Sequence, residues 1–332
     1  LIVSNACETA QPTNFFTPIT SKIDGISLES PPQPFKADAL TPIKTGTAAD
    51  WLALSPYAFT FPNKTDIHYD TKRQWWGESS EGINTIIQHA QANGFKIMLK
   101  PQVWIMNSWV GDFTLKNEQD WLTWEKNYQD YILNFAQIAT KHQVELFCIG
   151  TEYRIAAKER PKFWAQLADT IRTFYKGELV YAANWDNYEH ITFWDKVDYI
   201  GIDSYFPLCQ DVCPSVNKLV KSWQPTHSKL KKLHLKYQKP ILFPEFGYMS
   251  VDNTAWHHWE NEKNQQQLGL NLNAQNNAFE AFFRVFWHEP WFAGGFIWKW
   301  HVKHDTAGGL HDKDYTPQNK PSSEVIKKWY AL

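Results

Sequence analysis

The stretch VELFCIGTEY, residues 144–153, decides the fold. It begins as an apolar run that is typical of a strand buried on both faces of a parallel sheet. The run ends on the carboxylate of Glu152, and a charge is costly to bury without a partner. We therefore expect Glu152 to lie at the end of a buried strand, where water or a ligand reaches it.

Seven further apolar runs resemble this one, and each is followed by a loop and a segment with helical periodicity. The eight candidate strands are 22–28, 51–56, 95–101, 144–150, 178–184, 197–205, 239–247 and 293–300. Eight alternations of strand and helix predict an α/β fold, a single (β/α)₈ TIM barrel. An open doubly wound sheet is the alternative, but no glycine-rich nucleotide motif follows the first strand.

Four segments between these runs have the 3.6-residue periodicity of amphipathic helices. They are 79–94, 120–142, 161–177 and the longer, weaker segment 264–287. The second carries Trp, Tyr and Phe along one stripe, so we expect these aromatic side chains in the core rather than against a ligand.

The net charge and the aromatic content indicate which class of partner the protein binds. The formal net charge is −2, from 33 basic and 35 acidic residues, which gives no electrostatic footprint for nucleic acid or an anionic membrane surface. The aromatic share is 16% and includes 18 Trp. A large core accounts for more than half of these residues, and the surplus of Trp suits stacking on the C–H faces of sugar rings. We therefore expect a carbohydrate partner and no nucleic acid.

We expect residues 1–20 to form an N-terminal extension or tether and residues 21–332 to form the catalytic domain. The opening LIVSNAC resembles the end of a signal peptide followed by Cys7, so a lipid anchor at Cys7 is one interpretation and a cloning remnant the other. No apolar run reaches membrane-spanning length. The expected location is extracytoplasmic (secreted, periplasmic or lipid-anchored), with the cytoplasm as the alternative.

Three further cysteines raise the question of disulfides and metal. Cys148 lies inside an apolar run and is expected to be a small buried side chain. Cys209 and Cys213 are four residues apart between prolines, and a disulfide and free thiols are equally open alternatives. Two thiols alone cannot complete a zinc site.

Two histidine pairs are candidate metal ligands. Neither has the spacing of a zinc pair on a helix with a catalytic Glu between its members, so we expect no metal and no cofactor. The histidines are expected to face sugar or solvent; they are His257, His258, His301 and His304.

Two strand ends carry glutamates at the place where (β/α)₈ barrels build their active sites. Glu152 follows the fourth strand, and Glu245, in ILFPEFGY, ends the seventh, which faces the fourth across the barrel mouth. Retaining glycosidases use two carboxylates about 5–5.5 Å apart, one as nucleophile and one as acid/base. Mutual charge and partial burial keep one of them protonated. One strand-end Glu would suggest a rim ion pair, but two predict glycoside hydrolysis.

Other strand-end residues can complete a saccharide pocket. Tyr205 follows the sixth strand, and Trp298 and Trp300 end the eighth. Five polar residues can either bond a sugar hydroxyl or be satisfied by neighbours at the rim: Glu29, Lys100, Gln102, Asn184 and Asp203. Five more are expected on the same face, with a core position as the equal alternative for Trp104 and Trp109: Trp75, Trp76, Glu78, Trp104 and Trp109.

Together these motifs resemble glycoside hydrolase family 113, a clan A group of retaining (β/α)₈ enzymes whose characterised members are mainly endo-β-1,4-mannanases. The likeness runs from about residue 22 to the C-terminus, through WWGESSEGI, IMLKPQVWI, LFCIGTEY, FWDKVDYIGIDSYFPL, KPILFPEFGYMS, GGFIWKW and DYTPQNKPSSEVIKKWY. It implies that Glu152 is the acid/base and Glu245 the nucleophile. It also implies that Tyr205 lies near the nucleophile and that Trp298 forms the floor of the −1 subsite.

The sequence departs from the clan pattern at two positions. Thr151 stands where most members place the Asn that bonds the sugar 2-hydroxyl, which is compatible with the axial 2-hydroxyl of mannose. Gln102 stands where a His often follows Lys-Pro. The resemblance implies a β-linked oligo- or polysaccharide partner, most simply β-mannan, cleaved by an endo-β-1,4-mannanase.

Three alternatives remain open at this point. They are an exo-acting β-mannosidase, another β-glycanase on the same barrel and, in a different class, a non-catalytic carbohydrate-binding barrel. A binder gains little from a buried pair of like charges, which argues against the last of them.

Overall fold

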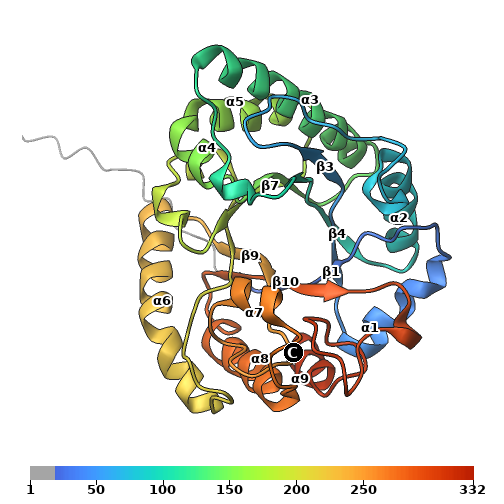
Figure 1. The fold of residues 1–332 in the computed structure, drawn as a ribbon, viewed down its shortest axis with the longest axis vertical. Coiled ribbons are helices and arrows are strands. Elements are labelled where there is room, and N and C mark those ends of the chain that lie inside the picture. Colours follow the sequence, from blue (N-terminus) through green and yellow to red (C-terminus); the bar gives the residue numbers. More distant parts are fainter. Residues whose placement is uncertain (1–18) are drawn as a thin grey trace, which may run out of the picture.

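Eight parallel strands close into a barrel in the computed structural model, which describes residues 19–332. Around the barrel the strand order is β1-β10-β9-β8-β7-β6-β4-β2. Figure 1 shows the strands at the centre with the helices around them. This confirms the predicted (β/α)₈ barrel. The strands are β1 (Ile23–Leu28), β2 (Trp51–Leu54), β4 (Lys96–Leu99), β6 (Leu146–Thr151), β7 (Glu178–Asn184), β8 (Tyr199–Asp203), β9 (Ile241–Phe246) and β10 (Phe292–Trp300).

The helices lie between successive strands and pack on the outside of the barrel. The predicted helices over 79–94, 120–142 and 161–177 are present as α2, α3 and α5. The full set is α1 (Thr41–Thr47), α2 (Ser80–Ala92), α3 (Glu118–Lys141), α4 (Arg154–Glu159), α5 (Pro161–Arg172), α6 (Val216–Tyr237), α7 (His258–Asn264), α8 (Leu272–Phe286) and α9 (Ser322–Tyr330).

Alternation along the strands sorts the core into two layers. On β6, Leu146 and Cys148 belong to the cluster that fills the barrel interior, whereas Phe147 and Ile149 belong to the larger cluster between barrel and helices. Side chains two apart on a strand share a face, so one apolar run supplies both layers. The predicted burial of Cys148 is confirmed.

A second, two-stranded sheet was not predicted. β3 (Tyr57–Thr60) pairs in parallel with β5 (Gln102–Ile105), each shortly after a barrel strand. Pro56 and Pro101 fall in the breaks, and proline has no N–H for a ladder bond. The chain nevertheless continues in extended form, and the Gln102 N–H donates to the Pro56 carbonyl at 2.9 Å. The predicted strands over 51–56 and 95–101 end at these prolines, so the second sheet that follows them was missed.

The helix predictions need two corrections. The helix over 216–237 was not predicted; Pro225 lies inside it, but Leu219, Trp223 and Leu230 are buried and Trp223 packs edge-on against Phe286 of α8. The predicted helix over 264–287 begins later than expected. Asn271 caps α8 by accepting a hydrogen bond from the Ala274 N–H at 3.0 Å, and the short α7 precedes it.

Three predictions concern membrane spans, the cysteine pair and the N-terminal segment. Across residues 19–332, none of the helices is both long and apolar enough to span a bilayer. Cys209 and Cys213 are free thiols, so of the two alternatives the structure has no disulfide between them. The lipid-anchor prediction at Cys7 lies outside the described residues.

Candidate active site

Glu152 follows β6 directly and has a left-handed backbone conformation, with φ of 54°. For a side chain other than glycine this conformation costs about 1–2 kcal/mol, so the neighbouring contacts must hold it in place. The Glu152 N–H donates to the Ala182 carbonyl of β7 at 2.8 Å, and the Arg154 N–H donates to the Glu152 carbonyl at 2.7 Å. The turn therefore fixes where the carboxylate points.

Trp109 holds the Glu152 carboxylate from the opposite side. Its indole Nε1–H donates to Glu152 Oε2 at 3.0 Å. The Arg154 guanidinium lies over the Trp109 ring, 5.0 Å from its centroid, and forms ion pairs with Asp112 and Asp186. Because Arg154 is held on both sides, the indole that contacts the carboxylate is fixed as well.

Glu245 lies near the end of β9 and has two donors. The Tyr205 hydroxyl donates to Glu245 Oε1, and the Lys100 ammonium donates to Glu245 Oε2 at 2.8 Å. The Ser204 N–H also donates to the Glu245 backbone carbonyl at 2.7 Å. Both carboxylate oxygens of Glu245 therefore accept from a donor, and the two bonds hold the side chain in one orientation.

Lys100 and Asp203 lie beneath Glu245, and each is only 1% exposed. The ammonium is 2.8 Å from Glu245 and 3.4 Å from Asp203. Burial lowers the lysine pKa, but the charges of Asp203 and Glu245 outweigh it and raise that pKa above its usual range. Of the two alternatives for these residues, a sugar contact or satisfaction by neighbours, the structure shows the second: Lys100 bonds both Asp203 and Glu245. A contact of either residue with sugar stays a prediction.

The environments of the two glutamates divide the roles between them. Burial, and next the charge of Glu245, raise the pKa of Glu152 to about 7, although the Trp109 hydrogen bond opposes the shift. Burial also raises the pKa of Asp203, although the charge of Lys100 opposes the shift. One carboxyl thus has a pKa raised to about 7 and its neighbour is ion-paired to a buried lysine, an arrangement that suits the acid and the nucleophile of a glycosidase.

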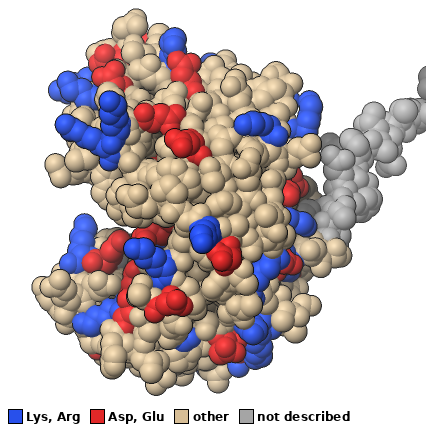
Figure 2. Space-filling model, turned by 90° about the vertical axis from the view of Figure 1, so that its right-hand side faces the viewer, with Lys and Arg blue, Asp and Glu red and all other residues tan. Residues whose placement is uncertain are grey.

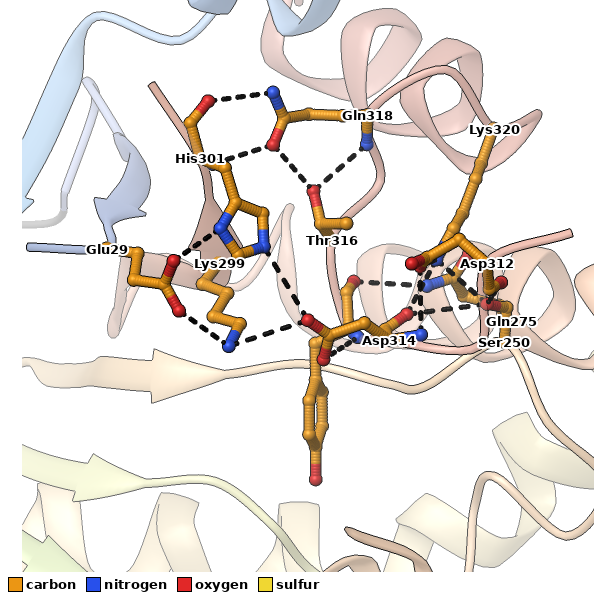
Figure 3. Close-up of polar contacts among 11 residues, drawn as sticks. Glu29, Ser250, Gln275, Lys299, His301, Asp312, Asp314, Thr316, Gln318 and Lys320 are labelled. Carbon is orange, nitrogen blue, oxygen red and sulfur yellow. Dashed lines mark hydrogen bonds and ion pairs between the residues drawn. The ribbon is translucent and has the colours of Figure 1, made fainter. Parts of the chain in front are cut away.

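An ion cluster at the rim joins β1, β10 and the C-terminal segment (Figure 3). Glu29 follows β1 and contacts both Lys299 and His301, while Asp314 lies 3.5 Å from Lys299 and 3.6 Å from His301. Two carboxylates alternate with two cations, and all four side chains are partly buried. Glu29 is therefore a rim residue satisfied by its neighbours.

The segment that follows β10 brings Tyr315 to the site. The Tyr315 ring packs edge-on against Tyr205, with centroids 6.1 Å apart, and Tyr205 donates to Glu245. The ion cluster thus anchors the segment that carries Tyr315. Tyr315 in turn packs against Tyr205, whose hydroxyl donates to Glu245.

Raising the pH above 6.5 is expected to weaken the fold through His301. Burial lowers its pKa, but hydrogen bonds with Asp314 and Glu29 raise it to about 9, because only the imidazolium donates from both ring nitrogens. This stabilisation is complete below the unfolded pKa of 6.5 and is lost as pH rises through about 9. The loss should amount to about 2–3 kcal/mol in the free energy of unfolding.

Denaturant unfolding of the wild type and His301→Gln between pH 5.5 and 9.5 measures this loss. His311→Gln, at an exposed position in the same segment, is the matched control. The difference between wild type and His301→Gln should shrink towards alkaline pH, and that for His311→Gln should stay constant. Parallel pH dependences for all three proteins would contradict the role of His301.

Trp300 is the clearest correction among the predicted contacts. It is 1% exposed, stacks on His304 at 5.5 Å, and lies against Gly46 of α1 on the outside of the barrel. The cause is a register shift: Ser27 and Leu28 of β1 pair with Trp298 and Trp300, so one residue of β10 is skipped. The bulge turns Trp300 outwards, while half-buried Trp298 stays with Tyr205 and Tyr315.

The remaining predicted contacts fall into two groups. Thr151 and Asn184 lie at the ends of β6 and β7, next to Glu152 and opposite Asp203 respectively, and are nearly buried. Trp104 is 62% exposed on β5, and Trp76 packs edge-on against Phe35 at the margin of the core. A contact of any of these four with sugar stays a prediction.

The structure also places the residues that sequence reasoning left undecided. Glu78 bonds the Trp75 N–H at 3.2 Å, and the Gln102 carbonyl accepts from the Tyr131 hydroxyl at 2.9 Å. His257 stacks between Trp256 and Trp259. Within the described part of the chain, no three His, Cys, Asp or Glu side chains are grouped to hold a metal ion.

Sequence reasoning missed Arg154 and Tyr315, and it left Trp109 as an equal choice between groove and core. Arg154 follows Glu152 by two residues and could have been weighed as a neighbour. Tyr315 lies 70 residues after Glu245 in a segment without strand or helix periodicity. The motif DYTPQNKPSSEVIKKWY that contains it supported the resemblance but gave Tyr315 no role.

Residues 33–320 match the sequence model of Glycoside Hydrolase Family 113. A comparison with curated protein sequences finds no match.

Solved structures resemble the whole barrel. The GH113 β-mannanase AaManA from Alicyclobacillus acidocaldarius, in complex with ManMIm, superposes with a TM-score of 0.82 at 24% identity, over 94% of this chain and 97% of that one. A GH113 β-1,4-mannanase gives 0.81 at 22% identity, over 94% and 99%. A β-glucuronidase from Ruminococcus gnavus gives 0.63 at 14%, over 93% of this chain and 50% of its own. At these identities the likeness establishes the fold.

Proposed function

Since this chain belongs to glycoside hydrolase family 113 and is a glycoside hydrolase, we propose that it is a retaining endo-β-1,4-mannanase acting on β-mannan or manno-oligosaccharides. The observation that carries the proposal is the unequal pair of glutamates, one ion-paired to Lys100 and the other with a raised pKa. The choice of mannan is supported by the mannanases that share the fold. Family membership argues against the non-catalytic barrel.

The proposed reaction has two steps. In the first, Glu245 attacks the anomeric carbon while Glu152 gives its proton to the departing glycosidic oxygen, which leaves the sugar covalently bound to Glu245. In the second, the Glu152 carboxylate takes a proton from water, the water oxygen bonds to the anomeric carbon, and Glu245 is released. Lys100 and Tyr205 hold the attacking carboxylate. Half-buried Trp298 lies in the same apolar cluster as Tyr205.

Activity should fall as the pH rises through about 7, because Glu152 must hold a proton to protonate the leaving oxygen. The pKa of Glu152 is raised to about 7, so its acid form predominates below that pH and is lost above it. The alkaline limb of kcat/KM should report this value. Trp109→Phe removes a donor that favours the ionised form, so it should move the limb to higher pH.

A pH series of kcat/KM for the wild type and Trp109→Phe tests this assignment. Trp256→Phe, at a half-buried tryptophan whose ring stacks on His257, is a suitable control and should leave the limb in place. An alkaline limb at the same pH in all three proteins would show that Glu152 does not set it.

Product analysis tests the substrate and the mode of cleavage. The purified protein would be incubated with mannohexaose, xylohexaose and cellohexaose, and products followed by chromatography. Early release of several internal fragments from mannohexaose is the expected result. Stepwise release of mannose would support an exo-acting β-mannosidase, and cleavage of another hexaose alone would replace mannan.

The proposed location is extracytoplasmic. It is supported by the substrate, because a polymer such as mannan does not enter a cell intact. Fractionation of the native host with an antibody against the protein would measure it, and recovery in the cytoplasmic fraction would contradict it.

A further inference from the structure

The β3–β5 sheet has one buried and one open face. Alternate residues are buried and pack towards the helices: Ala58, Thr60, Val103 and Ile105. The intervening residues are half-buried or exposed: Tyr57, Phe59, Gln102 and Trp104. Trp104, at 62% exposure, is a large apolar side chain left in water on an otherwise well-packed protein. Phe61 and Met106 directly follow the two strands and are also exposed, so Trp104 is part of an apolar patch rather than a single exposed side chain, and such patches mark interaction sites.

Three rings form a row across this open face. Phe59 pairs with Trp104 of β5, and on its other side it pairs with His68 through an antiparallel bridge. Paired residues project their side chains to the same face of a sheet. The rings of Phe59 and His68 lie 5.2 Å apart and are tilted by 32°. We name His68, Phe59 and Trp104 the ring row.

The ring row is continuous with the catalytic pair. From Lys100, which bonds Glu245, the chain runs through β5 to Trp109, which bonds Glu152. Tyr57 lies on the same face as Phe59, and the charges of Glu245 and Lys100 act on it. Phe59 follows Tyr57 by two residues on β3, a step of about 6.6 Å along the strand. The ring row therefore lies about one sugar ring farther from Glu245 than Tyr57 does.

The chemistry of this face fits a neutral chain of sugars. The two strands of this sheet contain no Lys, Arg, Asp or Glu, and half-exposed Phe61 and Met106 follow them. In Figure 2, Lys, Arg, Asp and Glu are scattered with wide uncharged areas between them, and a notch opens at the left edge, the side that faces the viewer in Figure 1. Flat aromatic rings stack on the C–H faces of pyranose rings and do not discriminate a single sugar unit.

We propose that the ring row binds the glycan chain at a sugar unit beyond those that flank the cleaved bond. The inference rests on the proposed function, because the occupant is the same chain that the catalytic pair cleaves. Its consequence is a preference for long substrates. Sugar units that reach the ring row add binding free energy, whereas a short substrate that occupies only the central subsites gains nothing from it.

Trp104→Ala is the variant that tests the inference. It removes the most exposed ring while leaving every described contact of the catalytic glutamates in place. Leu235→Ala, at 55% exposure on α6, is the matched control for loss of an exposed apolar side chain. The two readouts are kcat/KM for mannohexaose and kcat/KM for an aryl β-mannobioside.

The expected result is a fall of about tenfold in kcat/KM for mannohexaose, carried by KM, since a stacked ring is worth up to about 1.4 kcal/mol. The mannobioside value should stay unchanged in Trp104→Ala, and both values should stay unchanged in Leu235→Ala. In a Glu245→Gln background, the Kd of mannohexaose should rise by the same factor when Trp104 is replaced.

Two results would overturn the inference, and they differ. An equal effect of Trp104→Ala on both substrates, or no effect on either, would overturn the ring row alone. A wild type that cleaves neither substrate would overturn the proposed function and the ring row with it.

Discussion

Glu245→Gln is expected to lower kcat by about 10⁴-fold or more, because the amide cannot form the covalent bond to the anomeric carbon. The replacement keeps the size of the side chain, and its carbonyl oxygen can still accept from Lys100 or Tyr205. Binding of substrate should therefore survive while turnover stops. Initial rates on mannohexaose, and a Kd from titration, separate the two effects.

Azide rescue identifies the role of the missing group. In Glu245→Gly, azide can enter the vacated space and bond to the anomeric carbon of an activated substrate, which yields an α-configured glycosyl azide. In Glu152→Gly, azide attacks after the covalent step and yields the β-configured product. Glu324→Gln, at an exposed position on α9, is the control and should keep full activity. Full activity in Glu245→Gln would contradict the assignment of Glu245 as the nucleophile.

Lys100→Met is expected to have the second largest effect, a fall of about 10²–10³-fold in kcat. The methionine fills a similar volume but removes the buried cation 2.8 Å from Glu245. Glu245 then loses the cation that holds its carboxylate beside Asp203. The fall in kcat should persist when the rate is normalised to the folded fraction of the protein, which a purely structural defect would not produce.

A matched control separates this effect from loss of stability. Lys22 lies before β1, at the other end of the barrel strands, where its ammonium donates to the Glu289 and Phe292 carbonyls. Lys22→Met should lower the Tm without lowering kcat of the folded protein. If Lys100→Met raised KM and left kcat unchanged, Lys100 would be a substrate contact.

The sequence predicted the barrel because apolar runs buried on both faces leave a strong local signal. Each of the eight expected strands is present, and both glutamates lie where their strands end. The β3–β5 sheet was missed because Pro56 and Pro101 indicate strand ends, whereas the extended chain resumes after them. Helix α6 was missed because Pro225 interrupts its pattern, although burial of Trp223 outweighs the lost hydrogen bond.

Predicting the site was harder because it depends on pairings between distant segments. Trp298 and Trp300 are equivalent in a regular strand, and only the register shift against β1 separates them. Lys100 and Asp203 were correctly placed at strand ends, but their burial beneath Glu245 depends on how the barrel closes. The division between an extension and a domain near residue 20 stays a prediction.

The most direct test of the central claim, that Glu245 and Glu152 work as nucleophile and acid/base, is the anomeric configuration of the first product. Wild-type protein would be mixed with mannohexaose and the anomeric protons followed by NMR from the earliest time point. We predict that the new reducing ends appear as the β-anomer and only later equilibrate with the α-anomer. Initial appearance of the α-anomer would show single displacement and contradict the assignment of Glu245 as nucleophile.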